Sequence, residues 1–527
     1  MPADVSRLFP PPQTTVDRDL KRIVSLEQAT QDSGQRFVKI GLGGLFLVAV
    51  WIFSALLSGA IEGNTYIIAA AIIGGYMALN IGANDVANNV GPAVGSKALT
   101  LLGALLIAAV FESAGAILAG GDVVSTIKKG IIDPSLMPDS RTFIWTMMSA
   151  LLAAALWLNL ATYLGAPVST THSIVGGVMG AGIAATGFAA VNWPTMAKIA
   201  ASWVISPVMG GVIAALFLFF IKTAVLNKED KLTAARRWVP VVVAIMASAF
   251  SVYLVMKGFK KLWKADLTAI VIIGIVSFAA AYAIVRSWVG RRVRGLENRR
   301  KSVNTLFVVP LVCSAALLSF AHGANDVANA IGPLAAIVSA VSSGEIVAKA
   351  GIPLWVMAVG AAGISAGLFL FGPKLIRTVG QQITKLNPVR AFCVALAAAI
   401  TVIIASALGL PVSSTHIAVG GVFGVGFLRE FLDSRRRQGS LSHWPKASGI
   451  RWQDNTDKSA DELAAETRDQ LQKEFRKSKK RKLVRRSHLL TIVAAWVVTV
   501  PAAALLAAIL FLVFTGLGPK LSVALFG

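Results

Sequence analysis

Long apolar runs alternate with short polar stretches along almost the whole chain. Runs such as 43–61, 239–256 and 489–514 are each long enough to cross about 30 Å of hydrocarbon as an α-helix. A transmembrane β-barrel would instead show short segments of alternating polarity. We therefore predict an all-α polytopic membrane protein with about 12–13 transmembrane segments. The candidate segments lie near 38–60, 66–90, 98–120, 143–164, 168–190, 197–221, 239–256, 267–286, 303–330, 352–372, 388–409, 411–428 and 488–515.

Two motifs occur twice, in the same order. The stretch "GANDVANNVGP" at 82–92 returns as "GANDVANAIGP" at 323–333, and "GAPVSTTHSIVGGVMGAG" at 165–182 returns as "GLPVSSTHIAVGGVFGVG" at 409–426. The offsets between the copies are 241 and 244 residues. Two collinear matches with nearly the same offset indicate an internal duplication, because chance resemblance of Gly/Ala-rich helices gives isolated matches.

The two copies are predicted to cross the membrane in opposite directions. The second Asn-Asp motif lies seven steps after the first in this list of segments, and an odd number of steps reverses the direction. Inverted repeats with broken or re-entrant helices are typical of secondary transporters. Excess Lys and Arg place the loops 222–238, 287–302 and 429–487 on the cytoplasmic side, together with the N-terminal tail. The basic stretch 257–264 falls on the opposite side and does not fit this count.

This pattern predicts seven parts of the chain. They are a cytoplasmic tail (1–37), an extra N-terminal transmembrane helix (38–60), a first transport repeat (66–221), connecting helices with basic loops (222–302), a second transport repeat (303–428), a basic cytoplasmic loop (429–487) and a C-terminal transmembrane helix (488–527).

Charge and cysteine content narrow the class further. Only 14% of residues are charged, yet the formal net charge is +24. The basic residues gather in loops such as 291–301 and 476–486, which favours the positive-inside rule and contact with anionic lipid over nucleic-acid binding. Cys313 and Cys393 both lie in apolar runs and indicate neither a disulfide framework nor a metal site.

Each copy of the first motif places an aspartate inside an apolar run. A charged side chain there costs at least a few kcal/mol, so two such residues favour a functional role over a structural hydrogen bond between helices. Another asparagine follows one helical turn later on the same face. Carboxylate and amide oxygens together suit a cation. The candidate cation-coupling residues are Asp85, Asp326, Asn88 and Asn329.

Glycine and proline flank the first motif. They predict a helix break at Gly91–Pro92 and unwinding near Gly82. A break would free backbone carbonyl groups, which could join the side-chain oxygens around a cation.

The second motif places three hydroxyl side chains and a histidine after a proline, and a Gly-Gly helix follows. Proline fixes the entry of the chain, and Ser and Thr are good N-cap residues. The start of the helix offers backbone N–H groups and the positive end of the dipole, which suit a tetrahedral oxyanion. For either copy alone, a plain capped helix is the alternative. The hydroxyl residues are Ser169, Thr170, Thr171, Ser413, Ser414 and Thr415.

Three further titratable positions stand out. His172 and His416 end the second motif, and two interpretations stay open: a proton relay, or neutral rings hydrogen-bonded to carbonyl groups. Glu112 lies in an apolar run and for that reason is a further candidate for cation coupling. His322 precedes the second Asn-Asp motif where the first copy has Ile81, so it breaks the internal symmetry.

The two motif pairs predict one combined site. A divalent anion near the bilayer centre needs compensating charge, and cations held by Asp85 and Asp326 could supply it. Such an arrangement would couple the movement of the cations to that of the anion.

These motifs resemble those of the inorganic phosphate transporter (PiT) family, whose members carry GANDVAN-type and P-[AVI]-S-[ST]-[ST]-H-type motifs in both halves. The resemblance covers most of 66–428 and the terminal helix. It implies symport of inorganic phosphate by alternating access, driven by H⁺ or Na⁺, in the cytoplasmic membrane of a bacterium. It implies no enzymatic activity, no cofactor and no metal site.

Carried over residue by residue, the resemblance assigns Asn84 and Asn325, with the six hydroxyl residues, to phosphate binding. It places the two aspartates in cation and phosphate binding, and Glu112 matches an acidic position important in the family. One departure concerns 388–409, which contains no Asp or Glu and has Ala395 near the position of an acid in many sodium-coupled members. This difference weakens the case for Na⁺ and leaves H⁺ or metal–phosphate symport open.

Three other functions fit these motifs less well. Sulfate permease activity is the closest alternative, but phosphate can donate a hydrogen bond to an acceptor such as an aspartate and sulfate cannot. A membrane enzyme with a Ser/His/Asp centre lacks a strained nucleophile turn and leaves the duplication unexplained. A passive channel would need a continuous polar lining, whereas polar residues here cluster at the motifs. Small residues favour close helix packing and leave a homodimer open.

Overall fold

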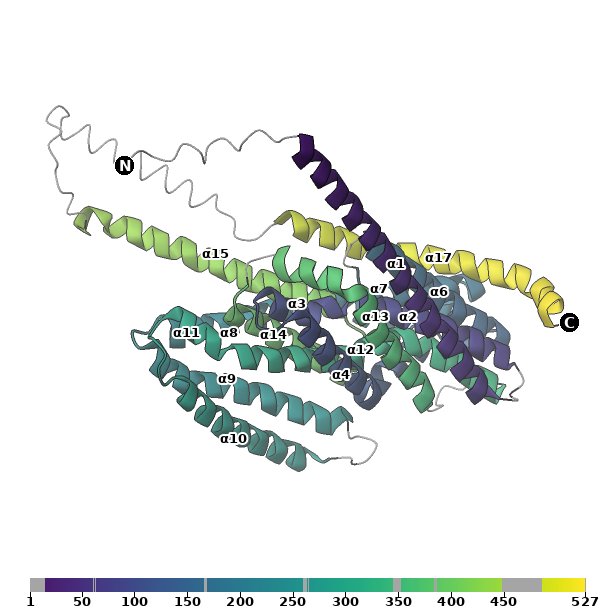
Figure 1. The fold of residues 1–527 in the computed structure, drawn as a ribbon. Coiled ribbons are helices and arrows are strands. Elements are labelled where there is room, and N and C mark those ends of the chain that lie inside the picture. The colour runs from purple at the N-terminus through teal and green to yellow at the C-terminus, as the bar shows by residue number, and fades with distance from the viewer. Residues whose placement is uncertain are drawn as a thin grey trace.

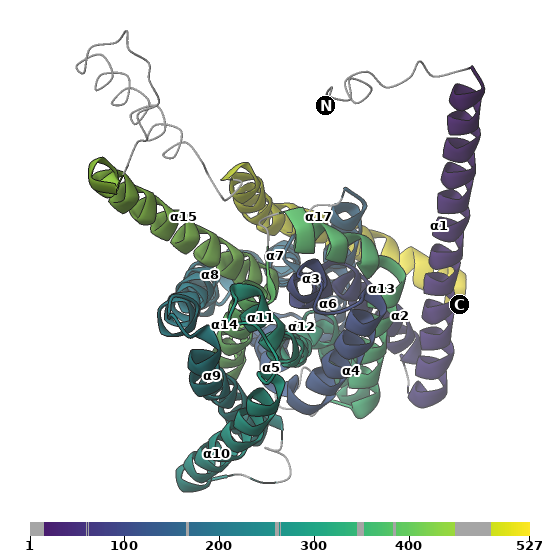
Figure 2. The ribbon, with the colours of Figure 1, turned by 60° about the vertical axis from the view of Figure 1, so that its left-hand side comes forward.

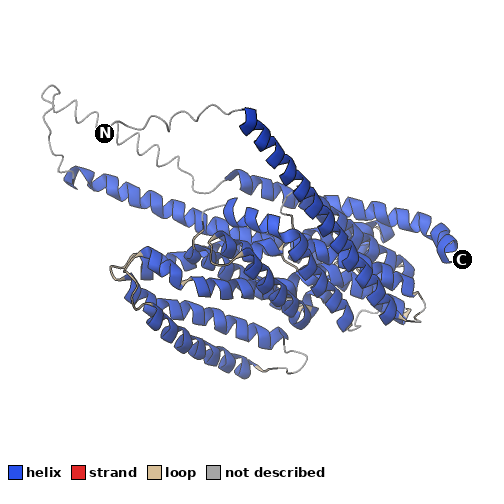
Figure 3. Cartoon of the chain, in the orientation of Figure 1, coloured by secondary structure: helices blue, strands red, loops and turns tan. Residues whose placement is uncertain are grey.

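The computed structural model describes residues 15–59, 61, 63–164, 168–258, 263, 265–344, 352–382, 386–447 and 486–526. These ranges are almost entirely helical and contain no strand, only an isolated β-bridge between Ile132 and Val191 (Figure 3). The part of the 429–487 loop that follows residue 447, up to residue 485, lies outside the described residues, as do residues 1–14 of the N-terminal tail.

The helices follow one another from end to end of the described chain (Figure 1). Their bounds are α1 Thr15–Ser58, α2 Asn64–Asn84, α3 Val86–Gly95, α4 Leu101–Ala119, α5 Gly121–Lys129, α6 Ser140–Leu164, α7 Thr170–Thr186, α8 Trp193–Ile221, α9 Lys231–Tyr253, α10 Leu267–Arg292, α11 Arg300–Leu306, α12 Val308–Ser343, α13 Leu354–Gln382, α14 Pro388–Ala407, α15 Ser414–Ala447 and α17 Arg486–Phe526.

Eleven spans within the described residues are long and apolar enough to cross a membrane. They account for eleven of the thirteen predicted segments. The other two are α7, with only 17 residues, and the Gly-rich first part of α15, and both begin at the Ser/Thr motifs. The predicted all-α polytopic fold with broken helices is therefore confirmed, and the two shorter segments are its partial helices.

The first Asn-Asp motif interrupts its helix at Asp85, between α2 and α3. The predicted break at Gly91–Pro92 is wrong, and so is the unwinding near Gly82, since both places are helical. The φ angle of proline is compatible with a helix, so Pro92 removes one hydrogen bond without ending α3. The second motif lies within the continuous helix α12.

Both motifs keep a proline inside the helix, Pro92 in α3 and Pro333 in α12. A proline has no N–H for the carbonyl group four residues earlier. The carbonyl groups of Asn88 and Asn329 therefore lose their usual helical donor. The freed carbonyls that the sequence predicted arise in this way rather than from an unwound segment.

The central helices are α12 and α14. Buried residues make up 78% of the apolar window of each, against 17% in α1 and none in α10. Figure 2 shows α12 near the middle of the bundle, with α1 and α10 at its outer edges. The uncovered apolar faces of α1 and α10 suit contact with lipid acyl chains.

The two partial helices exchange partners. Helix α8 follows α7 in the chain but packs on α15, while α17 follows α15 but packs on α7. Both crossings bring backbones together at a glycine. A Cβ atom at Gly180 would lie 2.1 Å from the Ala504 carbonyl oxygen, and one at Gly424 would lie 2.1 Å from that of Gly211. Gly180 and Gly424 are 244 residues apart, so the repeat in sequence is also a repeat in packing.

A second pair of equivalent crossings lies beside the Asn-Asp motifs. A Cβ atom at Gly82 would lie 1.9 Å from the carbonyl oxygen of Ile364, and one at Gly323 would lie 2.1 Å from that of Glu112. Gly82 and Gly323 are the same position of the repeated motif. Their partners Ile364 on α13 and Glu112 on α4 therefore hold equivalent places in the two halves.

Candidate functional site

The two Asn-Asp motifs, far apart in the chain, meet in the interior. Single ligand atoms of Asp85, His322 and Asp326 lie within 4.8 Å of one another, and all three side chains are buried. Two carboxylates at about this distance would repel each other by about 3 kcal/mol at an effective dielectric constant of about 20. The pair therefore requires positive charge or hydrogen-bond donors close by.

Asp85 receives hydroxyl groups from both halves of the chain. Thr170 donates to its Oδ2 atom at 2.6 Å, and Thr415 donates to its Oδ1 atom at 3.0 Å. Thr170 begins α7 and Thr415 lies in the first turn of α15, so one carboxylate connects the starts of both partial helices.

Asp326 has a different set of neighbours. Ser414 donates to its Oδ2 atom at 3.0 Å, which repeats the contact of Thr170 with Asp85. The Nε2 atom of His322 lies 2.8 Å from the same oxygen, without the alignment of a hydrogen bond. On the other side of the imidazole ring, Nδ1 lies 2.6 Å from Glu112 Oε2.

The asparagines one turn after the aspartates reach across to the other half. Asn88 donates to the Thr415 hydroxyl at 2.8 Å. Asn329 donates to the hydroxyl groups of Thr170 and Thr171, at 3.1 Å each. The Asn-Asp motif of each half thus hydrogen-bonds to the Ser/Thr motif of the other half. These contacts join the two motif types into one connected cluster.

The asparagines before the aspartates stay within their own half. Asn84 donates to the Thr162 hydroxyl at 3.1 Å, and Asn325 donates to the Ser406 hydroxyl at 2.9 Å. Asn325 also accepts from the Val412 backbone N–H at 3.3 Å. These contacts fix each Asn-Asp motif against the segment that leads into the Ser/Thr motif.

Several oxygen atoms of the cluster have no hydrogen-bond partner among the described residues. They are Oδ1 of Asn84, Asn88, Asn89, Asn329 and Asp326. Buried polar groups are normally paired, so unpaired acceptors call for a bound species. Oxygen acceptors without donors suit a cation, because hard cations take carboxylate, amide and carbonyl oxygens as ligands.

The partial helices α7 and α15 begin with the caps that the sequence predicted. Ser169 accepts the His172 N–H at 3.1 Å, and Ser413 accepts the His416 N–H at 3.3 Å. Thr171 donates to the Val412 carbonyl at 2.9 Å, which joins the two helix starts. Two positive helix ends therefore face one polar region, and such ends attract anions.

The histidines of the second motif lie among aromatic rings. The ring centroids of His172 and His416 are 4.5 Å apart. The His172 ring packs against Trp203 at 3.8 Å, and the His416 ring stacks on Trp496 at 3.5 Å. These contacts place each ring against tryptophan rather than against a carboxylate. The proton-relay role of these histidines stays a prediction.

Comparison with known proteins places this geometry in a family. The sequence profile described as the phosphate transporter family matches residues 81–507, which include both copies of both motifs. The chain belongs to the phosphate transporter family. It is a multi-pass membrane protein of a transporter family.

Relatives in this family cover nearly the whole chain. A Helicobacter pylori strain J99 protein named "Putative phosphate permease" is 48% identical, over 94% of this chain and 98% of the relative. A "Putative phosphate permease" of Pyrococcus abyssi is 39% identical, over 69% of this chain and 90% of the relative. A solved structure titled "The sodium-dependent phosphate transporter" matches with a TM-score of 0.72 and 34% identity, over 86% of this chain and 99% of the other.

The cluster includes residues that the motifs alone did not indicate. Thr162 and Ser406 hold Asn84 and Asn325, and they are 244 residues apart. Extending the alignment of the two motif copies by a few residues would have found them. Asn89, which donates to Glu112 Oε1 at 2.7 Å, has no such signal, because its counterpart in the repeat is Ala330.

Glu112 and His322 form a second contact that the motifs did not predict. The sequence marked Glu112 as a buried acid and His322 as a break in symmetry, and the structure joins them across 210 residues. Their side chains have no exposed surface. The assignment of individual residues to phosphate or cation stays a prediction for every member of the cluster.

Proposed function

We propose that this chain carries inorganic phosphate across the cytoplasmic membrane together with a monovalent cation, by alternating access. The observation that carries the proposal is the shared cluster, in which two aspartates accept hydroxyl groups from the starts of α7 and α15. Five buried oxygens of the same cluster have no hydrogen-bond partner in the part of the chain that the structure describes. Oxygen acceptors suit the cation and helix ends suit the anion. Binding one therefore favours binding the other, which is the thermodynamic basis of coupling.

Burial of the cluster supports a gated site rather than a pore. The side chains of Asp85, Asp326, Thr170 and Thr415 are each at most 1% exposed. Ions can reach them only when packed helices separate. The exchanged pairs α7–α17 and α15–α8 are candidates for that movement, because each joins a motif helix of one half to a helix of the other.

Na⁺ is the first candidate for the coupling ion. Both side chains that hydrogen-bond to Asp85 are threonine hydroxyls, and hydroxyl and carboxylate oxygens suit a hard cation. The similar solved structure is titled a sodium-dependent transporter. The lack of an acid in 388–409 keeps H⁺ as the second candidate.

Uptake of radiolabelled phosphate into liposomes that contain the purified protein tests this proposal. A Na⁺ gradient and a pH gradient are imposed separately, with sulfate as competitor. We expect uptake driven by the Na⁺ gradient and unaffected by sulfate. Uptake under neither gradient, or transport of sulfate in place of phosphate, would contradict the proposal.

Variants of the aspartates connect the transport to the cluster. Asp85→Asn and Asp326→Asn are each expected to lower uptake at least about 100-fold, since this corresponds to about 3 kcal/mol and each loses a carboxylate that accepts hydrogen bonds. The matched control is Ser54→Ala, which removes a buried hydroxyl of α1 outside the cluster. Equal losses in the control would attribute the effect to folding.

A further inference from the structure

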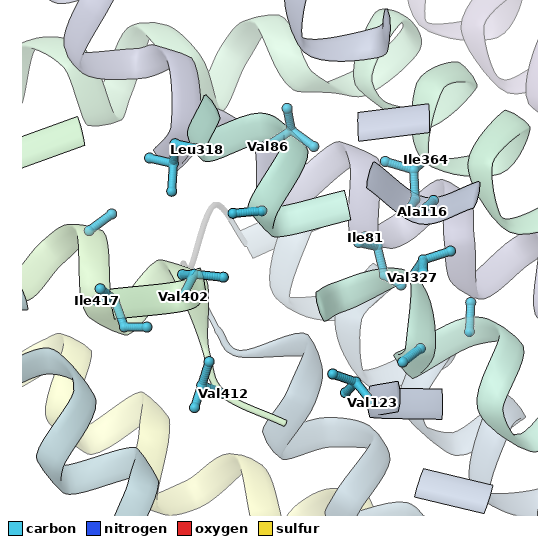
Figure 4. Close-up of a cluster of buried hydrophobic side chains, with 14 of the residues drawn as sticks. Ile81, Val86, Ala116, Val123, Leu318, Val327, Ile364, Val402, Val412 and Ile417 are labelled. Atoms are coloured by element: carbon cyan, nitrogen blue, oxygen red, sulfur yellow. The ribbon is translucent and has the colours of Figure 1, made fainter. Parts of the chain in front are cut away.

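The surroundings of His322 distinguish one half of the site from the other. The equivalent crossings described above pair Gly323 with Glu112 and Gly82 with Ile364. The residue one position before each glycine is His322 in one half and Ile81 in the other. One half therefore holds a His–Glu pair where the other holds two isoleucines, and Ile81 and Ile364 lie in the buried apolar cluster of Figure 4.

Glu112 fixes the hydrogen position on the imidazole ring. Asn89 donates to one oxygen of Glu112, and the other oxygen lies 2.6 Å from His322 Nδ1. The carboxylate is thus an acceptor at both oxygens, and the Nδ1–H donates to it. A neutral imidazole has one N–H, so Nε2 then presents its lone pair to the opposite side.

That lone pair faces two carboxylates. Nε2 lies 2.8 Å from Asp326 Oδ2 without hydrogen-bond alignment, and an oxygen of Asp85 completes a group within 4.8 Å. Oδ1 of Asp326 is buried and has no partner among the described residues. Two atoms 2.8 Å apart, such as Nε2 and Oδ2, can bind the same metal ion when each is about 2.1 Å from it.

A carboxylate that orients a histidine toward a metal is a recurrent arrangement. Metal-binding histidines usually donate their other N–H to a carboxylate or carbonyl group, which fixes the tautomer and raises the basicity of the ligand nitrogen. Here Asn89 in turn orients Glu112. The motifs alone do not indicate that these residues meet, because Asp85, Glu112 and His322 belong to three separate segments.

We propose that His322 Nε2, Asp326 and Asp85 form a binding site for a divalent first-row transition metal ion such as Zn²⁺, Mn²⁺ or Co²⁺. One imidazole nitrogen with carboxylate oxygens suits this class of ion better than it suits Na⁺ or Mg²⁺, which prefer oxygen ligands alone. The metal charge offsets the repulsion between the two aspartates. The site exists once, since Ile81 replaces the histidine in the other half.

Titration of the purified full-length protein with Co²⁺ tests this site without any transport assay. Bound Co²⁺ is followed by visible absorption, which reports nitrogen and oxygen ligands, and by calorimetry. We expect one Co²⁺ per chain, loss of binding in His322→Gln, and a 10- to 100-fold weaker affinity in Glu112→Gln, as typical for the loss of a group that orients a ligand.

The control is Ile81→Val, which alters the equivalent position of the other half and should leave Co²⁺ affinity unchanged. Absence of Co²⁺ binding to the wild-type protein, or equal binding by His322→Gln, would overturn the proposal and leave His322 as an ion-pair partner of Asp326. The wild-type titration decides the matter even where the variants do not fold. Phosphate uptake measured on the same preparation is a separate result, so failure of the metal site and failure of the transport function are distinguishable.

Discussion

The two aspartates of the cluster occupy equivalent places in a repeated fold, yet their surroundings differ. Asp85 has hydroxyl groups at both oxygens, with Ile81 one turn before it. Asp326 keeps one of those hydroxyl contacts and gains His322, which Glu112 holds in place. The backbone crossings are the same in both halves, so the duplication preserved the geometry while the chemistry of one half changed.

This difference distinguishes the residues that maintain the fold from those that serve the site. The glycines at the crossings and the hydroxyl residues that hold the asparagines occur in both halves, so they serve the common architecture. The His–Glu pair occurs once. Because the other half folds in the same way without such a pair, the His–Glu pair is not required for the fold. We therefore expect it to have a functional role.

The largest effect is expected when the His–Glu pair is broken on one side. His322→Ile copies the residue of the other half and leaves Glu112 as a buried carboxylate without its imidazole. Removal of one partner of a buried pair costs roughly 3–5 kcal/mol. Thermal unfolding of the detergent-solubilised protein, followed by size exclusion, measures this loss.

The double variant His322→Ile with Glu112→Ile is the control for that experiment. It installs both isoleucines of the other half, and replacement of a buried pair by apolar residues is often neutral. We expect its stability to lie within about 1 kcal/mol of the wild type. A double variant as unstable as the single one would show that the two surroundings are not equivalent in packing.

A medium effect is expected at the shared helix crossings. Gly82→Ala and Gly323→Ala each place a Cβ atom where a backbone carbonyl oxygen lies, at 1.9 and 2.1 Å respectively. The helices must separate, and such overpacking costs about 1–3 kcal/mol. The two variants should lose similar stability in the same unfolding assay. A loss in one variant alone would contradict the equivalence of the two crossings.

The smallest effect is expected at the hydroxyl groups behind the asparagines. Thr162→Val and Ser406→Ala each remove one hydrogen-bond partner of Asn84 or Asn325 while leaving the aspartates in place. A net loss of about 1 kcal/mol is typical of one such bond. The apparent affinity for phosphate in liposome uptake should weaken by up to about tenfold in both variants. Loss of all uptake in either variant would assign these residues a larger role.

Much of the fold could be predicted from the sequence. All thirteen apolar segments correspond to helices, because a long apolar run has few structural alternatives in a membrane. The helix break was misplaced, since a proline within a packed helix, such as Pro92, can be tolerated when neighbouring groups compensate for the lost hydrogen bond. The exchange of α8 and α17 between the halves could not be predicted, because helix pairing depends on packing over long sequence separations.

Most residues of the cluster could be named from the sequence, but few of the contacts between them could; their roles stay predictions. The repeated motifs identified both aspartates and all six hydroxyl residues of the Ser/Thr motifs. Contacts such as Thr415 with Asp85, or Glu112 with His322, join residues 330 and 210 positions apart. No local spacing encodes them, and only the inverted arrangement of the repeats brings these residues together.

A structure determined with phosphate and Na⁺ present tests the central claim most directly. The account predicts phosphate density between the starts of α7 and α15, in contact with hydroxyl groups of both Ser/Thr motifs, and a Na⁺ ion beside Asp85. Phosphate bound to one half alone, or at a place remote from Asp85 and Asp326, would contradict the claim that the two repeats share one transport site.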